Sequence, residues 1–205
     1  MSSVLPLDFY KRDTKKVAKE LLGKILVHVT PKGERVSGRI VETEAYLGIE
    51  DRACHSFGDR KSARTQPLYM VGGHSYVFLI YGMHFCFNVV TREQGVPEAV
   101  LIRALEPLEG IEVMRKRRPK AKRDVDLTSG PGKLCSALAI DKKSDALILN
   151  EGQLFIEDAP KLKPSRIIAS PRVGVDYAGE AALWPLRFSE KDNVFVSKPT
   201  PLRAK

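Results

Sequence analysis

The sequence contains few of the features that mark secreted proteins or proteins that span a membrane. Its three cysteines, Cys54, Cys86 and Cys135, are an odd number at irregular spacings, and no apolar signal-peptide segment stands near the N-terminus. A secreted disulfide scaffold is therefore not expected, and the predicted location is the reducing cytoplasm. No apolar run approaches the ~18 residues that span a bilayer, so we expect no membrane partner.

Sequence motifs typical of metal-binding and nucleotide-binding sites are also missing. The side chains that could group around an ion are Cys54, His55, His74, His84 and Cys86. No C-x-x-C or H-E-x-x-H pair anchors them, so we expect no metal and no cofactor. The G-P-G-K quartet at 130–133 lacks the G-x-x-x-x-G-K-[ST] spacing of a phosphate loop. A helix that begins there with Lys133 could still hold one backbone phosphate.

Positive charge is in excess. The chain has 34 Lys and Arg against 25 Asp and Glu, a formal net charge of +9, which favours polyanionic partners. The charge is densest in R-K-R-R-P-K-A-K-R at 115–123, within a basic loop that we place at about 115–126. Such a run is either a solvated, mobile loop or an arm that contacts phosphates, and one loop can be both.

The length and composition fit one domain. The 205 residues, 43% of them hydrophobic, can build a full core, and we find no internal repeat, low-complexity segment or linker. We therefore expect a single domain over 1–205. The expected fold is α+β, with a curved, mostly antiparallel sheet, flanking helices and a protruding β-hairpin.

Individual elements can be predicted from residue patterns. We expect helices at 15–22, capped by Asp13 or Thr14, at 106–118, and from 128–133 to 140 with Ser129 as a cap. We expect strands at 24–30, 36–46, 76–80, 84–90, 99–105, 146–157, 166–172 and 193–197. The stretch 47–73 reads as a long loop with at most short helical turns, and loops of that length tend to be functional.

The hairpin at 75–90 carries an unusual tip. Its strands fold about Tyr81-Gly82-Met83, where either Gly82-Met83 forms a two-residue type II′ loop or all three residues form the turn. Tyr81 stands where soluble proteins usually place Asn, Asp or Ser. It either folds back on its own hairpin or enters something, as bulky side chains of some DNA-binding proteins do between base steps.

Two carboxylates lie on one face of the strand at 36–46. Strand alternation places Ile40, Glu42, Glu44 and Tyr46 on the same side. Neighbouring charges can make one of the two glutamates a general base. Alternatively, both pair with Arg39, Arg103 or loop lysines. Arg103 interrupts an apolar strand, so it lies at the sheet end or is paired.

Six ordered blocks together resemble a known family. They are V-E-T-E-A-Y-L-G at 41–48, A-C-H-S at 53–56, Y-V-F-L-I-Y-G-M at 76–83, L-I-R-A-L-E-P-L-E-G at 101–110, S-G-P-G-K-L-C at 129–135 and R-V-G-V at 172–175. They resemble the alkyladenine (methylpurine) DNA glycosylases, also called 3-methyladenine DNA glycosylases of the animal type. The resemblance runs from about residue 7 to 197, and the order of the blocks makes it specific.

The resemblance implies a role for individual residues. Glu44 corresponds to the general base that activates a water, and Arg103 to a residue beside that water. Tyr81 corresponds to the wedge that fills the gap left by the flipped nucleotide. The residues implied to contact the target base are Tyr46, Ala53, His55, Phe78, Asn88 and Val173, with Asn88 crowding the amino group of normal guanine. The candidates for DNA-backbone contacts are Arg115, Arg117, Arg118 and Lys133.

One local conflict bears on the hairpin turn. A two-residue loop would place Phe78 and Asn88 on opposite faces, whereas the resemblance implies one pocket. A three-residue turn or a bulge restores a common face, so we favour that arrangement. Phe78 stands where the family often has Tyr, so any hydrogen bond made by that hydroxyl is absent, while stacking is expected to remain.

The implied function is a monofunctional DNA glycosylase of base excision repair. It would flip and excise alkylated or deaminated purines of the 3-methyladenine, 7-methylguanine, hypoxanthine and ethenoadenine class, acting as a monomer on double-stranded DNA with damaged purines. In a bacterium it would associate with the nucleoid. The alternatives are a non-catalytic nucleic-acid-binding module and a hydrolase of free nucleosides. The enzymatic interpretation fails if Glu44 is locked in an interior salt link with no cavity between it and Tyr46.

Overall fold

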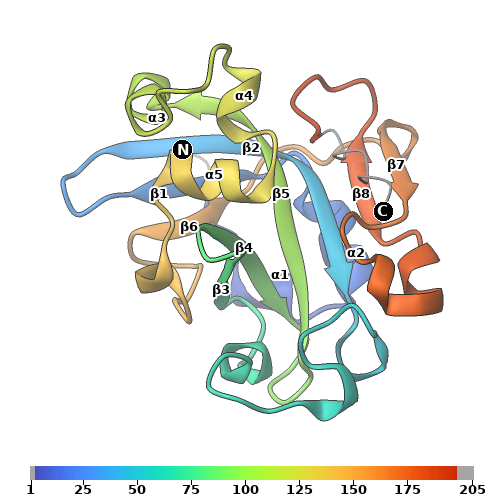
Figure 1. The fold of residues 1–205 in the computed structure, drawn as a ribbon. Coiled ribbons are helices and arrows are strands. Elements are labelled where there is room, and N and C mark those ends of the chain that lie inside the picture. The colour runs from blue at the N-terminus through green and yellow to red at the C-terminus, as the bar shows by residue number, and fades with distance from the viewer. Residues whose placement is uncertain (1–2, 198–205) are drawn as a thin grey trace.

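An antiparallel sheet of eight strands is the frame of the computed structural model, which describes residues 3–197 (Figure 1). Six strands follow the order β3-β4-β5-β2-β1-β6, while β8 pairs with β2 and with β7. The strands are β1 (Ile25–Val29), β2 (Arg35–Tyr46), β3 (Ser75–Ile80), β4 (His84–Thr91), β5 (Glu98–Glu109), β6 (Leu154–Glu157), β7 (Ile167–Ser170) and β8 (Arg187–Glu190). The sheet curls into a half-barrel, which confirms the predicted α+β fold in one compact domain.

The helices are short. They are α1 (Leu7–Tyr10), α2 (Thr14–Leu21), α3 (Ile111–Arg117), α4 (Val125–Thr128) and α5 (Pro131–Leu138), with 3₁₀ turns η1 (Gly48–Glu50), η2 (Phe57–Asp59), η3 (Gln66–Tyr69), η4 (Lys142–Ser144), η5 (Pro164–Arg166) and η6 (Asp176–Leu183). As predicted, the Asp13 carboxylate caps α2 by accepting a hydrogen bond from the Lys16 amide at 3.0 Å. Within residues 3–197 no helix has the length and apolar character of a membrane span.

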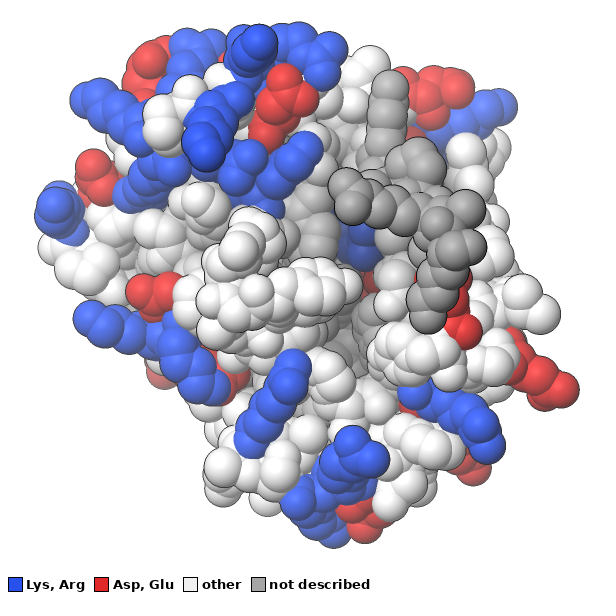
Figure 2. Space-filling model, viewed as in Figure 1, with Lys and Arg blue, Asp and Glu red and all other residues white. Residues whose placement is uncertain are grey.

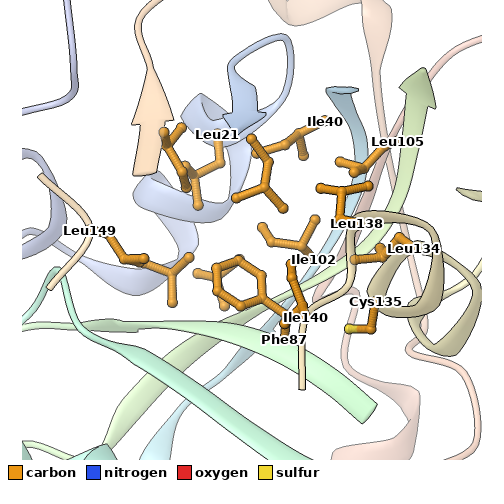
Figure 3. Close-up of a cluster of buried hydrophobic side chains, with 14 of the residues drawn as sticks. Leu21, Ile40, Phe87, Ile102, Leu105, Leu134, Cys135, Leu138, Ile140 and Leu149 are labelled. Atoms are coloured by element: carbon orange, nitrogen blue, oxygen red, sulfur yellow. The ribbon is translucent and has the colours of Figure 1, made fainter. Parts of the chain in front are cut away.

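The main core lies between the sheet and the helices α2 and α5 (Figure 3). Leu21 of α2 and Leu138 of α5 meet Phe87 of β4 and Ile102 of β5, and all four side chains are fully buried. Burying each is worth roughly 1.5–3 kcal/mol. The hydroxyl of Thr43 donates to the Ala18 carbonyl at 2.9 Å, which ties α2 to β2. Because this core lies on one face of the sheet, the opposite face, which carries the polar residues of β2, remains available for a site.

The alternation predicted for β2 is wrong at Ile40. The pairing of β2 with β5 shifts register between Ile40 and Glu42 and again before Thr43, as at a β-bulge. Ile40 therefore joins Ala45 in the main core instead of sharing a face with Glu42 and Glu44. The bulge turns both carboxylates away from the core.

The hairpin confirms the three-residue turn. Ile80 pairs with His84, which leaves Tyr81, Gly82 and Met83 as the loop, so the two-residue type II′ assignment is wrong. Tyr81 and Gly82 have φ of +52° and +71°, a left-handed conformation that is costly for tyrosine. This turn restores the common face that a two-residue loop would have broken.

Several predicted boundaries are corrected. The helix expected at 106–118 begins only at Ile111, because β5 continues to Glu109 along β2 and Gly110 turns the chain with φ +71°. Ser129 does not cap α5, which starts at Pro131 after Gly130. Residues 193–197 form turns instead of a strand. The strands expected at 146–157 and 166–172 are shorter than predicted and correspond to β6 and β7. The loop at 47–73 contains only 3₁₀ turns, as predicted.

We expect Gly110→Ala to destabilise the fold more than Gly33→Ala. Both glycines have positive φ, +71° and +77°, so both substitutions carry the left-handed penalty of about 1–2 kcal/mol. A Cβ at Gly110 would lie 2.6 Å from Cγ1 of Val36, whereas one at Gly33 meets no atom within 4 Å. The clash should add roughly 1–3 kcal/mol, measurable by urea denaturation. Equal losses for the two variants would contradict this account of the β5–α3 turn.

Candidate active site

A cavity of about 140 Å³ opens between the hairpin, β5 and two loops. In Figure 1 the loop at 47–73 lies below the end of β2 and the start of β5. This loop contributes Ala53, Cys54, His55 and Leu68 to the cavity lining. The lining includes the sequence-predicted residues Tyr46, Ala53, His55, Phe78, Asn88, Arg103 and Val173. It also includes residues that sequence reasoning missed, among them Tyr76, Cys86 and Tyr177. Side chains from distant segments thus meet around one mostly aromatic and apolar space.

Glu44 lies fully buried next to this cavity, behind its lining. Its Oε1 accepts a hydrogen bond from the Val173 amide at 2.8 Å and lies 3.3 Å from Nη1 of Arg103. Its Oε2 accepts from the Tyr46 hydroxyl at 2.9 Å. A carboxylate offers about four acceptor positions, so these contacts leave one on Oε2 for a further donor. The interior salt link named above is present. The Tyr46 hydroxyl contacts Glu44 directly, so the cavity does not lie between these two side chains but beside them, where Tyr46 and Arg103 line it.

Arg103 is paired, in the middle of β5. Its Nε donates to Oε1 of Glu42 at 3.1 Å, while Nη1 faces Glu44. Burial lowers the pKa of Arg103, but the carboxylates of Glu44 and Glu42 outweigh burial and raise that pKa above its ordinary value. The guanidinium therefore stays charged beside the cavity.

Aromatic side chains form the cavity walls. The His55 ring stands edge-on to Phe78, with ring centres 4.6 Å apart, and its Nδ1 lies 2.8 Å from the Tyr76 hydroxyl. Tyr76 therefore supplies a hydroxyl two residues before Phe78, on the same strand face. The Arg64 guanidinium lies 5.1 Å from the centre of the Phe78 ring. These contacts hold the ring of His55 in one orientation.

Burial lowers the pKa of His55 to about 4, and the charges of Arg64 and Arg60 act in the same direction. The imidazole is therefore neutral near pH 7. A neutral ring can stack on a cationic base without charge repulsion.

A buried ion pair joins the loops around the cavity. Nη2 of Arg172 donates to Oδ1 of Asp51 at 2.8 Å, and neither side chain is exposed. Oδ1 also accepts from the Ala53 amide at 3.0 Å, and the Arg172 guanidinium lies 4.7 Å from the centre of the Tyr46 ring. Asp51 and Arg172 are 121 positions apart in the chain, so no local sequence pattern predicts that they pair. It fixes the loop that carries Ala53 and His55.

Asn88 faces the cavity from β4, opposite Tyr76 on β3. Its Nδ2 donates to the Tyr76 carbonyl at 3.0 Å, and the side chain is buried. Phe78 pairs with Cys86, two residues before Asn88, so Phe78 and Asn88 share one face. Tyr177 closes another side, with its hydroxyl 3.4 Å from the Ala53 carbonyl.

Tyr81 and the predicted DNA-backbone residues, Arg115, Arg117, Arg118 and Lys133, do not line the cavity. Tyr81 is 83% exposed at the hairpin tip. Figure 2 shows Lys and Arg gathered over α3, α4 and their connection, with a largely uncharged band below. Arg115 and Arg117 belong to the last turn of α3, so the basic run is partly helical.

Carboxylate and carbonyl groups already contact the arginines of this run. Arg115 pairs with Glu112 and Asp124, while Arg117 pairs with Glu34 at 2.7 Å. Arg118 donates to the Asp126 carbonyl at 3.3 Å, and Nζ of Lys133 lies 3.3 Å from the Ser129 hydroxyl. Any phosphate would therefore compete with these partners.

No metal cluster occurs in the part of the chain that the structure describes: no three His, Cys, Asp or Glu side chains group there as ion ligands. All three cysteines are buried and unbridged.

Comparisons with known proteins agree on one family. Residues 8–194 match the family model described as methylpurine-DNA glycosylase. A protein of Methanocella arvoryzae is 52% identical over 199 residues, 97% of this chain and 98% of its own length. One of Bdellovibrio bacteriovorus is 53% identical over 198 residues, 95% and 99% of the two chains, and one of Desulfitobacterium hafniense is 50% identical over 197, 93% and 96%. All three are named "Putative 3-methyladenine DNA glycosylase".

We expect the imidazole of His55 to titrate with a midpoint near pH 4 in the folded protein, measured by NMR. An exposed histidine titrates near pH 6.5. Because unfolded His55 takes up its proton near pH 6.5 and the folded residue only near pH 4, the free energy of unfolding should fall as pH decreases across this window. Arg64→Gln should move the midpoint upward. A midpoint near 6.5 in the parent protein would contradict the buried, neutral ring.

Proposed function

The chain belongs to the methylpurine-DNA glycosylase family, whose members hydrolyse N-glycosidic bonds in DNA repair, and we propose that it releases alkylated and deaminated purines from double-stranded DNA. The proposed substrates are purines of the 3-methyladenine, 7-methylguanine, hypoxanthine and ethenoadenine class. The animal-type designation has no support from the relatives named above, which are archaeal and bacterial. The observation that carries the proposal is a buried carboxylate with a free acceptor position beside an aromatic cavity.

Glu44 is the proposed general base. A water on the free position of its Oε2 would lose a proton to the carboxylate as the water oxygen bonds to the anomeric carbon. The electrons of the broken glycosidic bond would leave with the purine, and an N-alkylated purine already carries the positive charge that accepts them. Arg103 and the Val173 amide, both on Oε1, would hold the carboxylate with Oε2 directed to the water. No lysine nucleophile is needed, so the enzyme would be monofunctional and leave an abasic site.

The cavity walls are proposed to select the base. Tyr46, His55 and Phe78 would stack on the extruded purine, with base–aromatic stacking worth roughly 1–3 kcal/mol per base. The backbone of Ala53 and His55 would read the base edge, and Val173 would touch the base. Asn88 would crowd the exocyclic amino group of guanine, since its amide is held by the Tyr76 carbonyl.

Tyr81 is the proposed wedge. Flipping a nucleotide costs a few kcal/mol, and an exposed aromatic at a hairpin tip can fill the gap and offset part of that cost. Its left-handed backbone supports this role, because strained residues persist where the surrounding structure imposes them and cluster at functional sites.

The residues proposed to contact DNA phosphates are Arg115, Arg117, Arg118 and Lys133. On binding, each would replace the carboxylate, carbonyl or hydroxyl group of the protein that it contacts now with a phosphate.

We propose that residues 1–205 work as one glycosylase domain, with the basic loop at about 115–126. We also propose that the protein acts as a monomer in the cytoplasm, on the nucleoid if its source is bacterial.

We expect Glu44→Gln to retain lesion binding and lose base release by at least about 100-fold, because removing a general base costs 10²–10⁴-fold. The measurement is single-turnover release of 3-methyladenine and hypoxanthine from duplex DNA, with Glu50→Gln, an exposed carboxylate of the nearby loop, as the control. Full activity of Glu44→Gln would remove Glu44 from the base role. Binding without any base release by the parent protein would leave only a DNA-binding module.

Tyr81→Ala should weaken excision from duplex DNA on the order of 10-fold or more, since part of the flipping cost is no longer offset. Excision from a single-stranded lesion should change much less. Tyr81→Phe keeps the ring and serves as the matched control, with near-parent activity. Equal losses on both substrates would argue against a wedge.

A further inference from the structure

Arg64 places a positive charge against the wall of the cavity. It lies in the loop at 47–73, between η2 and η3, and it is exposed. The central carbon of its guanidinium lies 5.1 Å from the centre of the Phe78 ring, which lines the cavity. The charge therefore stands next to a ring that is proposed to stack on the extruded purine.

The charge of Arg64 also acts on three other side chains that line the cavity. Burial lowers the pKa of His55 to about 4, and the charge of Arg64 acts in the same direction. Burial raises the pKa of Tyr76 and that of Cys86, and the charge of Arg64 opposes the rise at both. These three residues belong to the loop, to β3 and to β4, so the positive potential of Arg64 extends across the cavity.

The loop around Arg64 is held by hydrogen bonds. The Thr65 hydroxyl donates to the Arg60 carbonyl at 3.0 Å and accepts from the Ser62 amide at 2.9 Å, and Thr65 is buried. Leu68, three positions after Thr65, is buried and lines the cavity. These contacts fix the backbone from which the Arg64 side chain extends.

Arg64 differs from two other arginines beside the cavity because it has no ion pair. Arg103 pairs with two buried glutamates of β2, and Arg172 pairs with a buried aspartate. Within residues 3–197 no carboxylate forms a salt bridge with Arg64. Its charge is therefore not balanced by a neighbouring side chain of the described chain.

A charge in this place distinguishes two classes of purine. In DNA, 3-methyladenine carries a positive charge that Arg64 repels, whereas hypoxanthine is neutral. When the glycosidic bond breaks, its electron pair goes to the purine, so 3-methyladenine leaves as a neutral base. Hypoxanthine leaves with a negative charge until it takes a proton from solvent, and a nearby cation stabilises that charge. Both effects favour hypoxanthine relative to 3-methyladenine.

We propose that Arg64 is a specificity-determining residue, whose charge favours the release of neutral deaminated purines over that of positively charged alkylated purines. The inference rests on the proposed function, because it concerns the base that would occupy the cavity. It does not depend on the exact pose of that base, since like charges repel at any position within the cavity.

The test compares release of hypoxanthine and of 3-methyladenine from duplex DNA in single turnover, with the protein below saturation. At about pH 7.5 the His55 ring is neutral in every variant, because even an exposed histidine titrates near pH 6.5. Arg64→Gln should lower the rate constant for hypoxanthine relative to that for 3-methyladenine by at least about 3-fold, after solvent screening of the exposed charge. Changes in DNA affinity that are common to the two substrates cancel in this ratio.

Two variants serve as matched controls. Arg64→Lys retains the positive charge and should keep the ratio within about 2-fold of the parent value. Lys61→Gln removes a positive charge from the same loop, where Lys61 pairs with Asp59 at 3.2 Å and lies 5.2 Å from the centre of the Tyr69 ring. Neither of these partners lines the cavity, so this variant should also keep the parent ratio.

The outcomes separate this role from the proposed function. An unchanged ratio in Arg64→Gln would overturn the proposal even if both rates fell, because Arg64 would then act only as a DNA contact. A ratio that fell equally in Lys61→Gln or in Arg64→Lys would overturn it as well, since the effect would not depend on this charge at this position. If the parent protein releases neither base, the proposed function itself fails. If it releases both and Arg64→Gln leaves the ratio unchanged, only the role of Arg64 fails.

Discussion

The site depends on one buried guanidinium shared between two carboxylates. Arg103 lies inside β5, and both of its partners stand on β2, two residues apart. Removing one member of such a cluster would leave an uncompensated charge in the interior, which typically costs 3–5 kcal/mol. The strands therefore cannot slide past each other without breaking the charge balance, and the register that stabilises the sheet also sets the geometry of the proposed chemistry.

The rest of the cavity is built before any ligand arrives. The Asp51–Arg172 pair fixes the loop that carries Ala53 and His55, and the Tyr76 hydroxyl fixes the ring of His55. A pocket that is already ordered loses little conformational entropy when it binds. In the proposed function, such a pocket would select bases by shape. An ordered frame of this kind supports the proposed function, in which undamaged purines would be rejected.

Local patterns predicted the elements that depend on neighbouring residues. The cap of α2, the hairpin strands and the polar side of β2 all follow from residues close together in the chain, and the resemblance placed seven residues that do line the cavity, Tyr46, Ala53, His55, Phe78, Asn88, Arg103 and Val173. The features that sequence reasoning did not predict depend on segments that are far apart in the chain. The bulge that separates Ile40 from Glu42 is imposed by β5, and the pairing of Asp51 with Arg172 joins distant segments. The periodicity of a sequence does not predict pairing between distant segments.

The hairpin turn has a consequence for how this chain can vary. Three loop residues place Phe78, Cys86 and Asn88 on the cavity side and Phe87 in the core. Adding or deleting one residue in the turn would change this parity. One strand would then present its core side chains to the pocket and its pocket side chains to the core. The length of this turn is therefore under stronger constraint than its exposure suggests, and only changes of two residues at a time keep both the pocket and the core.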